Sequence, residues 1–228
     1  MGDSIKIIKN CDDYLVIVKP SGLIVHPNAH QKTSTLVDWL IEKYPIIKGV
    51  GENEMRPGIV HRLDQDVSGL MVVAKNSKSF YHLKKQFQDR LVKKEYYGLV
   101  FGKPDPDQGE ITLSVGRSKT EPGKFKIKHD QTGKPCLTQY QVTKKFKKFA
   151  LLDIILKTGR THQIRVHLKG IGHSLVGDKL YKSKGGKTSL DRIFLHAYSL
   201  GFNDLNGQWQ QFKIDLPPDL KSYLAKLE

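Results

Sequence analysis

Residues 61–69 carry more information about fold and chemistry than any other stretch, and they read His61-Arg62-Leu63-Asp64-Gln65-Asp66-Val67-Ser68-Gly69. Apolar runs lie on both sides, at residues 57–60 and 70–73, and each predicts a short strand. Asp64 therefore stands beside an arginine between two core segments. A carboxylate in that position is unfavourable unless it is paired, hydrogen-bonded or used in chemistry. For an arbitrary aspartate, hydrogen bonds to nearby backbone would be a sufficient explanation.

The composition indicates a globular protein with an anionic partner. The chain has 228 residues, of which 38% are hydrophobic, which is enough for a sizeable core and excludes a disordered chain. Lysine and arginine total 38 against 23 acidic residues, so the formal net charge is +15. Such a surplus favours polyanions, first of all nucleic acid. A lysine-rich protein that is merely soluble would show the same balance.

The cysteines and the N-terminus point to a reducing compartment. Cys11 and Cys136 are too few for a disulfide framework or a zinc site. Residues 1–6 lack the apolar core of a signal peptide, and no apolar run reaches the length of a membrane span. We therefore expect a cytoplasmic protein.

The first part of the chain mixes strands and helices. Two short strands are predicted over residues 5–9 and 14–19. A helix is predicted over 35–44, a loop over 44–55, a strand over 70–75, and a helix from an N-cap at Ser77 to about Arg90.

Strands dominate the remainder. Alternating or apolar runs predict them at residues 95–101, 110–115, 125–128, 136–143, 149–157, 196–202 and 208–214. A short helix is predicted over 161–169, and a last one begins after Pro217-Pro218 with an apolar stripe that serves for docking. Because regular βαβ alternation is missing, the fold class is α+β with a mixed, mostly antiparallel central sheet and flanking helices.

The segment around Asp64 resembles the active-site signature of the RluA family of RNA pseudouridine synthases. The similarity rests on His-Arg-Leu-Asp, two variable residues, and a segment that ends in Ser68-Gly69-Leu70. The resemblance implies that Asp64 is the catalytic residue, in one catalytic domain with its active site in a central cleft. The family pattern covers residues 14–216. It therefore predicts a single domain over residues 1–228, without a separate N-terminal RNA-binding domain.

Two further segments extend the resemblance. Lys19-Pro20-Ser21-Gly22 with Val25-His26-Pro27 is similar to the first family block, although Lys-Pro-x-Gly alone is a common turn. Lys94-Glu95-Tyr96 is similar to the strand that carries the family's active-site tyrosine, which implies that role for Tyr96. From the residues alone, Tyr96 could equally pack in the core with its hydroxyl bonded to a neighbour. The adjacent Tyr97 faces the other side of the strand.

The longest matching run is residues 156–168, Leu-Lys-Thr-Gly-Arg-Thr-His-Gln-Ile-Arg-Val-His-Leu, which continues to Gly177-Asp178 and Tyr181. By resemblance, Arg165 pairs with the catalytic Asp64. A guanidinium suits this role because it donates two parallel hydrogen bonds and favours the ionised carboxylate. Arg160 contacts either an RNA phosphate or the protein itself. His162 and His167 are spaced by five residues with no third ligand nearby, so we expect no metal site.

The reaction implied is the isomerisation of uridine in RNA to pseudouridine, which requires no cofactor. Asp64 acts as a nucleophile on the ribose or as the base that starts the ring chemistry. Tyr96 stacks on the base, and Leu195 forms an apolar wall beside it. Arg62 either fills the space of a flipped base, clamps a phosphate, or makes a structural ion pair. His61, next to Arg62, is a further candidate for contact with the substrate.

Two departures from the family and two rival functions remain. Val67 stands where the family usually has threonine and Ser174 where it often has proline, and both affect substrate positioning more than chemistry.

One rival is an RNA-binding or ribosome-assembly protein without catalysis. The other is a glycoside hydrolase that uses Asp64 with Asp66 or Asp178. The resemblance implies transfer RNA or large-subunit ribosomal RNA as substrate, and the high charge predicts a monomer.

Overall fold

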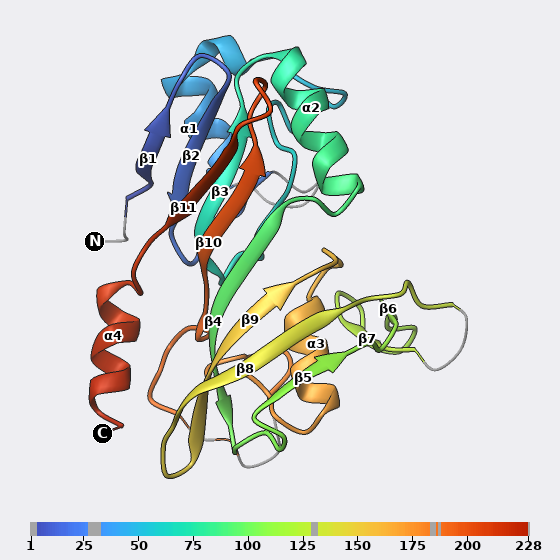
Figure 1. Ribbon diagram of the computed structural model, residues 1–228, viewed down its shortest axis with the longest axis vertical. Helices are drawn as coiled ribbons and strands as arrows, with labels where there is room; N and C mark the ends of the chain where they lie inside the picture. The colour runs from blue at the N-terminus through green and yellow to red at the C-terminus, as the bar shows by residue number, and fades with distance from the viewer. Residues whose placement is uncertain (1–3, 27–32, 129–131, 183–185, 187, 228) are drawn as a thin grey trace. The chain divides into compact units, whose positions relative to one another are not determined.

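The computed structural model describes residues 4–26, 33–128, 132–182, 186 and 188–227 (Figure 1). Pro27, part of the first motif block, lies outside these residues. The chain forms two compact units. Unit 1 comprises Met1–Lys93 and Ser199–Ile214, and unit 2 comprises Lys94–Tyr198 and Asp215–Glu228. The single catalytic domain stays a prediction.

Unit 1 is built on antiparallel strands. Strand β1 (Lys6–Asn10) pairs with β2 (Tyr14–Lys19), which pairs with β3 (Ser68–Ala74). The second half of β10 (Leu195–Asn203) forms a hairpin with β11 (Trp209–Lys213). All seven residues of β3 are buried, as the continuous apolar run predicts. The predicted strand at residues 57–60 is wrong, because only a single bridge, Ile59 to Val73, forms there.

The helices of unit 1 begin at side-chain caps. Helix α1 (Leu36–Lys43) starts at Thr35, whose hydroxyl accepts from the Asp38 amide while the Asp38 carboxylate accepts from the Thr35 amide. Its end is followed by the short 3-10 helix η1 (Pro45–Ile47). Helix α2 (Ser77–Gln88) is capped by Asn76, which accepts from the Ser79 amide. The expected cap at Ser77 is therefore wrong by one residue, because the amide oxygen of Asn76 reaches the orphan N–H first.

Unit 2 contains the larger antiparallel array. Its strands run in the order β4 (Lys93–Phe101), β9 (Phe149–Leu156), β8 (Thr138–Lys145) and β5 (Gln108–Ile111). A separate two-stranded ribbon joins β6 (Val115–Arg117) to β7 (Phe125–Ile127). The single strand predicted over 110–115 is thus divided, and its two ends belong to different sheets.

Two helices complete unit 2. Helix α3 (Gln163–Gly170) packs against β7 and β8, and Figure 1 shows it (orange) against one face of the β8–β9 strands. Helix α4 (Pro218–Ala225) places its predicted apolar stripe in a core cluster, with Leu220 and Tyr223 buried beside Leu99 and Phe194. The α+β class with a mostly antiparallel sheet is confirmed. No helix among the described residues is both long and apolar enough to cross a membrane.

Candidate active site

The predicted site residues lie in both units. Asp64, Arg62 and His61 belong to unit 1, whereas Tyr96, Arg160, Arg165 and Leu195 belong to unit 2. The predicted pairing of Asp64 with Arg165 joins the two units and stays a prediction.

Asp64 stands at the start of a tight turn that leads into β3. The Val67 amide donates to the Asp64 carbonyl at 3.1 Å, which closes the turn. Leu63 and Val67 are 4% and 2% exposed and anchor the segment in the core, while Asp64 between them is half-buried. Two buried apolar residues therefore flank the turn on either side of Asp64 and fix its backbone, which is the support that a catalytic group requires.

A buried lysine, Lys19, stabilises this turn by hydrogen bonds to backbone carbonyls. The Lys19 side chain is fully buried, and its Nζ donates to the carbonyls of Pro20 at 2.7 Å, Leu23 at 2.7 Å and Gln65 at 2.9 Å. Ser21 and Gly22 add hydrogen bonds to the carbonyls of Asp66 and Gln65. The Lys-Pro-x-Gly segment, which is weak as a sequence signal, thus ties the end of β2 to the turn that begins at Asp64.

Lys19→Met tests this support. The substitution keeps the volume but removes the buried ammonium group and its three hydrogen bonds to backbone carbonyls, so we expect the free energy of unfolding to fall by about 3 kcal/mol. Thermal unfolding of this variant is compared with Lys9→Met, which removes an exposed lysine of β1. Equal melting temperatures for the two variants would show that the ammonium group is not needed.

His61 and Arg62, which precede Leu63, each make a hydrogen bond that involves a histidine ring. The backbone amide of Val72 donates to His61 Nε2 at 3.0 Å, and the His61 ring stacks on Phe87 with centroids 4.6 Å apart. Arg62 is exposed, and its Nη1 donates to Nε2 of the buried His26 at 3.0 Å. The contact of His61 with substrate stays a prediction, since the structure gives that ring a role within unit 1.

Tyr96 and Tyr97 occupy opposite faces of β4. Tyr96 lies opposite Ile154 of β9 and is 6% exposed. Tyr97 lies opposite Asp153 and stacks on Tyr198 with centroids 3.9 Å apart, and the Tyr198 hydroxyl donates to the Asp153 carboxylate. Burial, followed by the nearby Asp153 carboxylate, raises the pKa of Tyr97. Tyr97 thus belongs to a structural aromatic pair and is a matched control for Tyr96.

Tyr96→Phe is expected to retain the fold and to lower turnover about 100-fold, because a positioned hydroxyl in proton transfer contributes on that order. Tyr97→Phe leaves the Tyr198–Asp153 bond in place and should reduce turnover less than about threefold. Initial rates on the same RNA, with melting temperatures as a folding control, check both. Comparable losses in the two variants would remove the special role of Tyr96.

Leu195 lies on the same side of unit 2 as Tyr96. Tyr96 and Gly98 are two residues apart on β4 and so face the same side. A Cβ atom added at Gly98 would come within 3.7 Å of the Leu195 Cδ1 atom, and Leu195 is 3% exposed. The predicted apolar wall beside the base is consistent with this placement and stays a prediction.

Arg165 makes a two-point ion pair with Asp178. Its Nε and Nη2 donate to Asp178 Oδ2 and Oδ1, each at 2.8 Å, and the two side chains are 3% and 0% exposed. Asp178 Oδ1 also accepts from the amides of Leu180 and Tyr181. Both partners are desolvated, so the geometry of the guanidinium is fixed by bonds that are strong in a low dielectric. A carboxylate committed in this way is a poor general acid, which weakens the glycoside hydrolase alternative.

The loop that carries Asp178 has little freedom. Gly177 has φ +76°, and a Cβ atom there would meet the Arg192 carbonyl oxygen at 1.9 Å, so only glycine fits. Tyr181 follows, and its ring lies 5.0 Å from the Arg165 guanidinium carbon. The Tyr181 hydroxyl accepts from the Phe125 amide and contacts His162 Nδ1 at 2.8 Å. This network holds Arg165 from a second direction.

The segment before α3 is organised by Gln163, which is 2% exposed. Its Oε1 accepts from the Arg160 amide and the Thr158 hydroxyl, and its Nε2 donates to the Leu137 carbonyl and the Thr138 hydroxyl. Arg160 is half-buried, and its Nε has no hydrogen-bond partner among the residues that the structure describes. A buried N–H group without a partner is unfavourable, so an acceptor outside the protein would satisfy it. An RNA phosphate, predicted for Arg160 from the sequence, is one such acceptor.

His162 and His167 have hydrogen-bond partners within the protein. His167 is fully buried, and its Nε2 is 2.7 Å from the Leu113 carbonyl, so Nε2 donates. Burial lowers the pKa of His167, which keeps the ring neutral. His162 contacts the Tyr181 hydroxyl. Within the described residues, no group of three or more His, Cys, Asp or Glu side chains is arranged to hold a metal ion.

Comparison with known proteins identifies the family. The family model of RNA pseudouridylate synthases matches residues 13–169, which include the Asp64 turn, Tyr96 and Arg165. This chain belongs to the RNA pseudouridylate synthase family. The resemblance to RluA-type enzymes is thereby confirmed.

The pseudouridine synthase relatives match most of this chain. An RNA pseudouridine synthase of Chloroflexus aurantiacus is 42% identical over 92% of the chain and 65% of its own length. Ribosomal large subunit pseudouridine synthase D of Nitrosomonas europaea is 40% identical over 95% of the chain and 63% of its own length. The chain thus spans slightly less than two thirds of these two pseudouridine synthases.

A solved structure supports the same fold. Human RNA pseudouridylate synthase domain containing 1 superposes with a TM-score of 0.78 and 26% identity, over 96% of this chain and 87% of the human chain. The elements that carry Asp64, Tyr96 and Arg165 therefore occur in a known pseudouridylate synthase fold.

Sequence reasoning missed two supporting residues. In the sequence, Asp178 ends the longest matching run and stands only as the acid of a rival glycoside hydrolase, since no local pattern shows that it bonds to Arg165 thirteen residues earlier. Lys19 was assigned to a turn, because fully buried lysines are rare and no pattern in one sequence marks them. Both act on the candidate residues through hydrogen bonds to backbone or guanidinium.

Proposed function

We propose that this chain isomerises uridine in RNA to pseudouridine, with Asp64 as the nucleophile and without a cofactor. The observation that carries the proposal is the half-buried Asp64 carboxylate, held by an anchored turn within a family match that also includes Tyr96 and Arg165. A carboxylate fixed in this way suits covalent attack at the anomeric carbon of a ribose.

The reaction conserves all atoms. Asp64 forms a bond to the anomeric carbon as the N-glycosidic bond of uridine breaks. The uracil turns, and its carbon 5 displaces the Asp64 carboxylate from the same ribose carbon. The proton then lost from carbon 5 is balanced by one gained at nitrogen 1. Arg165, oriented by Asp178, keeps Asp64 ionised and aimed. Tyr96 stacks on the uracil and assists the final proton removal, and Leu195 lies against the base.

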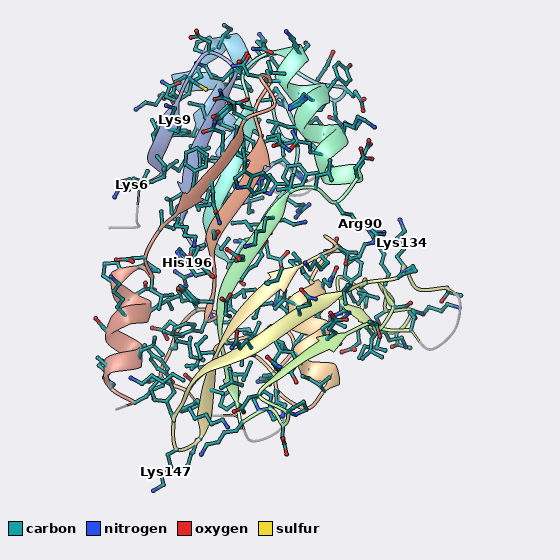
Figure 2. All side chains as sticks on the ribbon, viewed as in Figure 1. Lys6, Lys9, Arg90, Lys134, Lys147 and His196 are labelled. Carbon is teal, nitrogen blue, oxygen red and sulfur yellow. The ribbon has the colours of Figure 1, made fainter. Side chains whose placement is uncertain are left out.

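RNA is held by the basic surface. The net charge of +15 supplies many phosphate contacts, and lysines such as Lys147 at the β8–β9 turn point away from the ribbon (Figure 2). Arg62 acts where the base leaves the stack, either in the vacated space or on a phosphate. Arg160 offers its unpaired Nε to a phosphate.

Large-subunit ribosomal RNA is the first substrate to test, because relatives at 38% and 40% identity are named for that activity. Transfer RNA is the second. We propose that the protein acts as a monomer in the cytoplasm.

Release of tritium from RNA labelled at carbon 5 of uridine tests the function. Ribosomal and transfer RNA are incubated separately with the protein, and release from one pool is expected. Tight binding to either RNA without release would favour an RNA-binding protein that does not catalyse.

A further inference from the structure

Arg62 and His26 form a contact with a fixed direction. Arg62 Nη1 lies 3.0 Å from His26 Nε2. A guanidinium carries five N–H donors and no acceptor. His26 Nε2 must therefore be the acceptor, and the ring must be neutral with its proton on Nδ1. The pair holds only while one specific tautomer of His26 is present.

The two partners differ in burial. His26 is 2% exposed and follows a segment whose Ile24 and Val25 carbonyls accept from the Leu36 and Val37 amides at the start of α1. Arg62 is exposed and lies outside regular secondary structure. A free arginine side chain samples many rotamers, and ordering it on RNA would be entropically unfavourable. The ring of His26 removes part of that freedom beforehand.

His61, which precedes Arg62, also accepts a hydrogen bond at its Nε2 atom, but from the main chain and not from a side chain. His61 Nε2 accepts from a backbone N–H, that of Val72, so His61 fixes the main chain of the segment. His26 instead fixes a side chain that reaches solvent. Of the two histidine rings, therefore, only that of His26 bears on the orientation of a group that can meet RNA.

We infer that His26 is a positioning residue for Arg62. It holds one N–H of the guanidinium, so that the remaining N–H groups face the RNA as a single pre-oriented plane. The inference rests on the proposed function, in which Arg62 contacts RNA. Because one ordered side chain is involved, loss of the His26 acceptor should weaken RNA binding about tenfold and raise KM more than it lowers kcat.

Four variants test the inference: His26→Gln, His26→Asn, Arg62→Ala, and the double variant of His26→Leu with Arg62→Ala. The amide group of Gln reaches the position of Nε2, whereas that of Asn reaches only the position of Nδ1. His26→Gln should recover most of the affinity and His26→Asn should not. The double variant should bind RNA no more weakly than Arg62→Ala alone.

Affinity for RNA is measured beside KM, kcat and melting temperature. Equal affinities for the Gln and Asn variants, or weaker binding by the double variant than by Arg62→Ala alone, would overturn the positioning role. This comparison of polar variants stands even if the leucine substitution unfolds the chain. Absence of turnover by wild type would instead count against the proposed function, while the affinity series would still decide the role of His26.

Discussion

Asp64→Asn is expected to abolish turnover, with a fall of at least about 1,000-fold, on the order seen when a nucleophile is removed. The amide has the same size as the carboxylate but cannot attack the ribose. The Asp64 carbonyl that accepts from Val67 remains, and Leu63 and Val67 stay in the core, so the turn should persist. RNA affinity should therefore change less than about threefold. Single-turnover kinetics and RNA binding measure the two effects separately.

Asp66→Asn is the matched control for this prediction. Asp66 lies in the same turn, and its side chain is exposed. Its hydrogen bond from the Ser21 hydroxyl is accepted by the backbone carbonyl, so the substitution leaves this bond in place. The Asp66 variant should retain turnover within a few-fold of wild type. A retained rate in the Asp64 variant, or an equal loss in the Asp66 variant, would take the nucleophile role away from Asp64.

The second large effect is expected for Arg165→Lys, with a fall in turnover of about 100-fold although the charge is kept. Lysine offers a point charge in place of two parallel N–H groups, so Asp178 loses its two-point partner. The cation would then no longer be held in the orientation that the proposed pairing with Asp64 requires. Rates at saturating RNA measure this loss.

Arg192→Lys serves as the control, since Arg192 contacts the exposed Asp219 at 3.4 Å, without the two parallel bonds that Arg165 makes to Asp178. It should leave turnover within about twofold of wild type. Arg165→Lys with wild-type rates would mean that the guanidinium geometry is not used in catalysis.

The sequence predicted the regular elements well where one periodicity dominates. The predicted ends of β3 and β9 lie within two residues of the observed ends. Burial of β3 on both faces leaves a continuous apolar run, and deeper burial of one face of β9 leaves an alternating pattern. The apolar–polar alternation over residues 110–115 predicts one strand. The chain instead leaves β5 after Ile111, and Val115 begins a different ribbon. Strand partners, which no local pattern encodes, decide that division.

The candidate site was predictable only in part. Asp64, Tyr96 and Arg165 were found through their motifs, and the opposite orientation of Tyr97 follows from the two-residue repeat of a strand. The supports were not predictable, since Lys19 bonds to the Gln65 carbonyl 46 residues away and Arg62 bonds to His26 across 36 residues. Such contacts depend on tertiary structure rather than on local propensity.

Nucleoside analysis of the reacted RNA tests the central claim most directly. Unlabelled ribosomal RNA transcribed in vitro is incubated with wild type or Asp64→Asn, digested, and separated by liquid chromatography, which resolves pseudouridine from uridine of identical mass. Wild type should convert the target uridine of the RNA into pseudouridine, and the Asp64 variant should convert none. Pseudouridine produced equally by both proteins would contradict the assignment of Asp64. Its absence with wild type, on ribosomal and transfer RNA alike, would contradict the proposed activity.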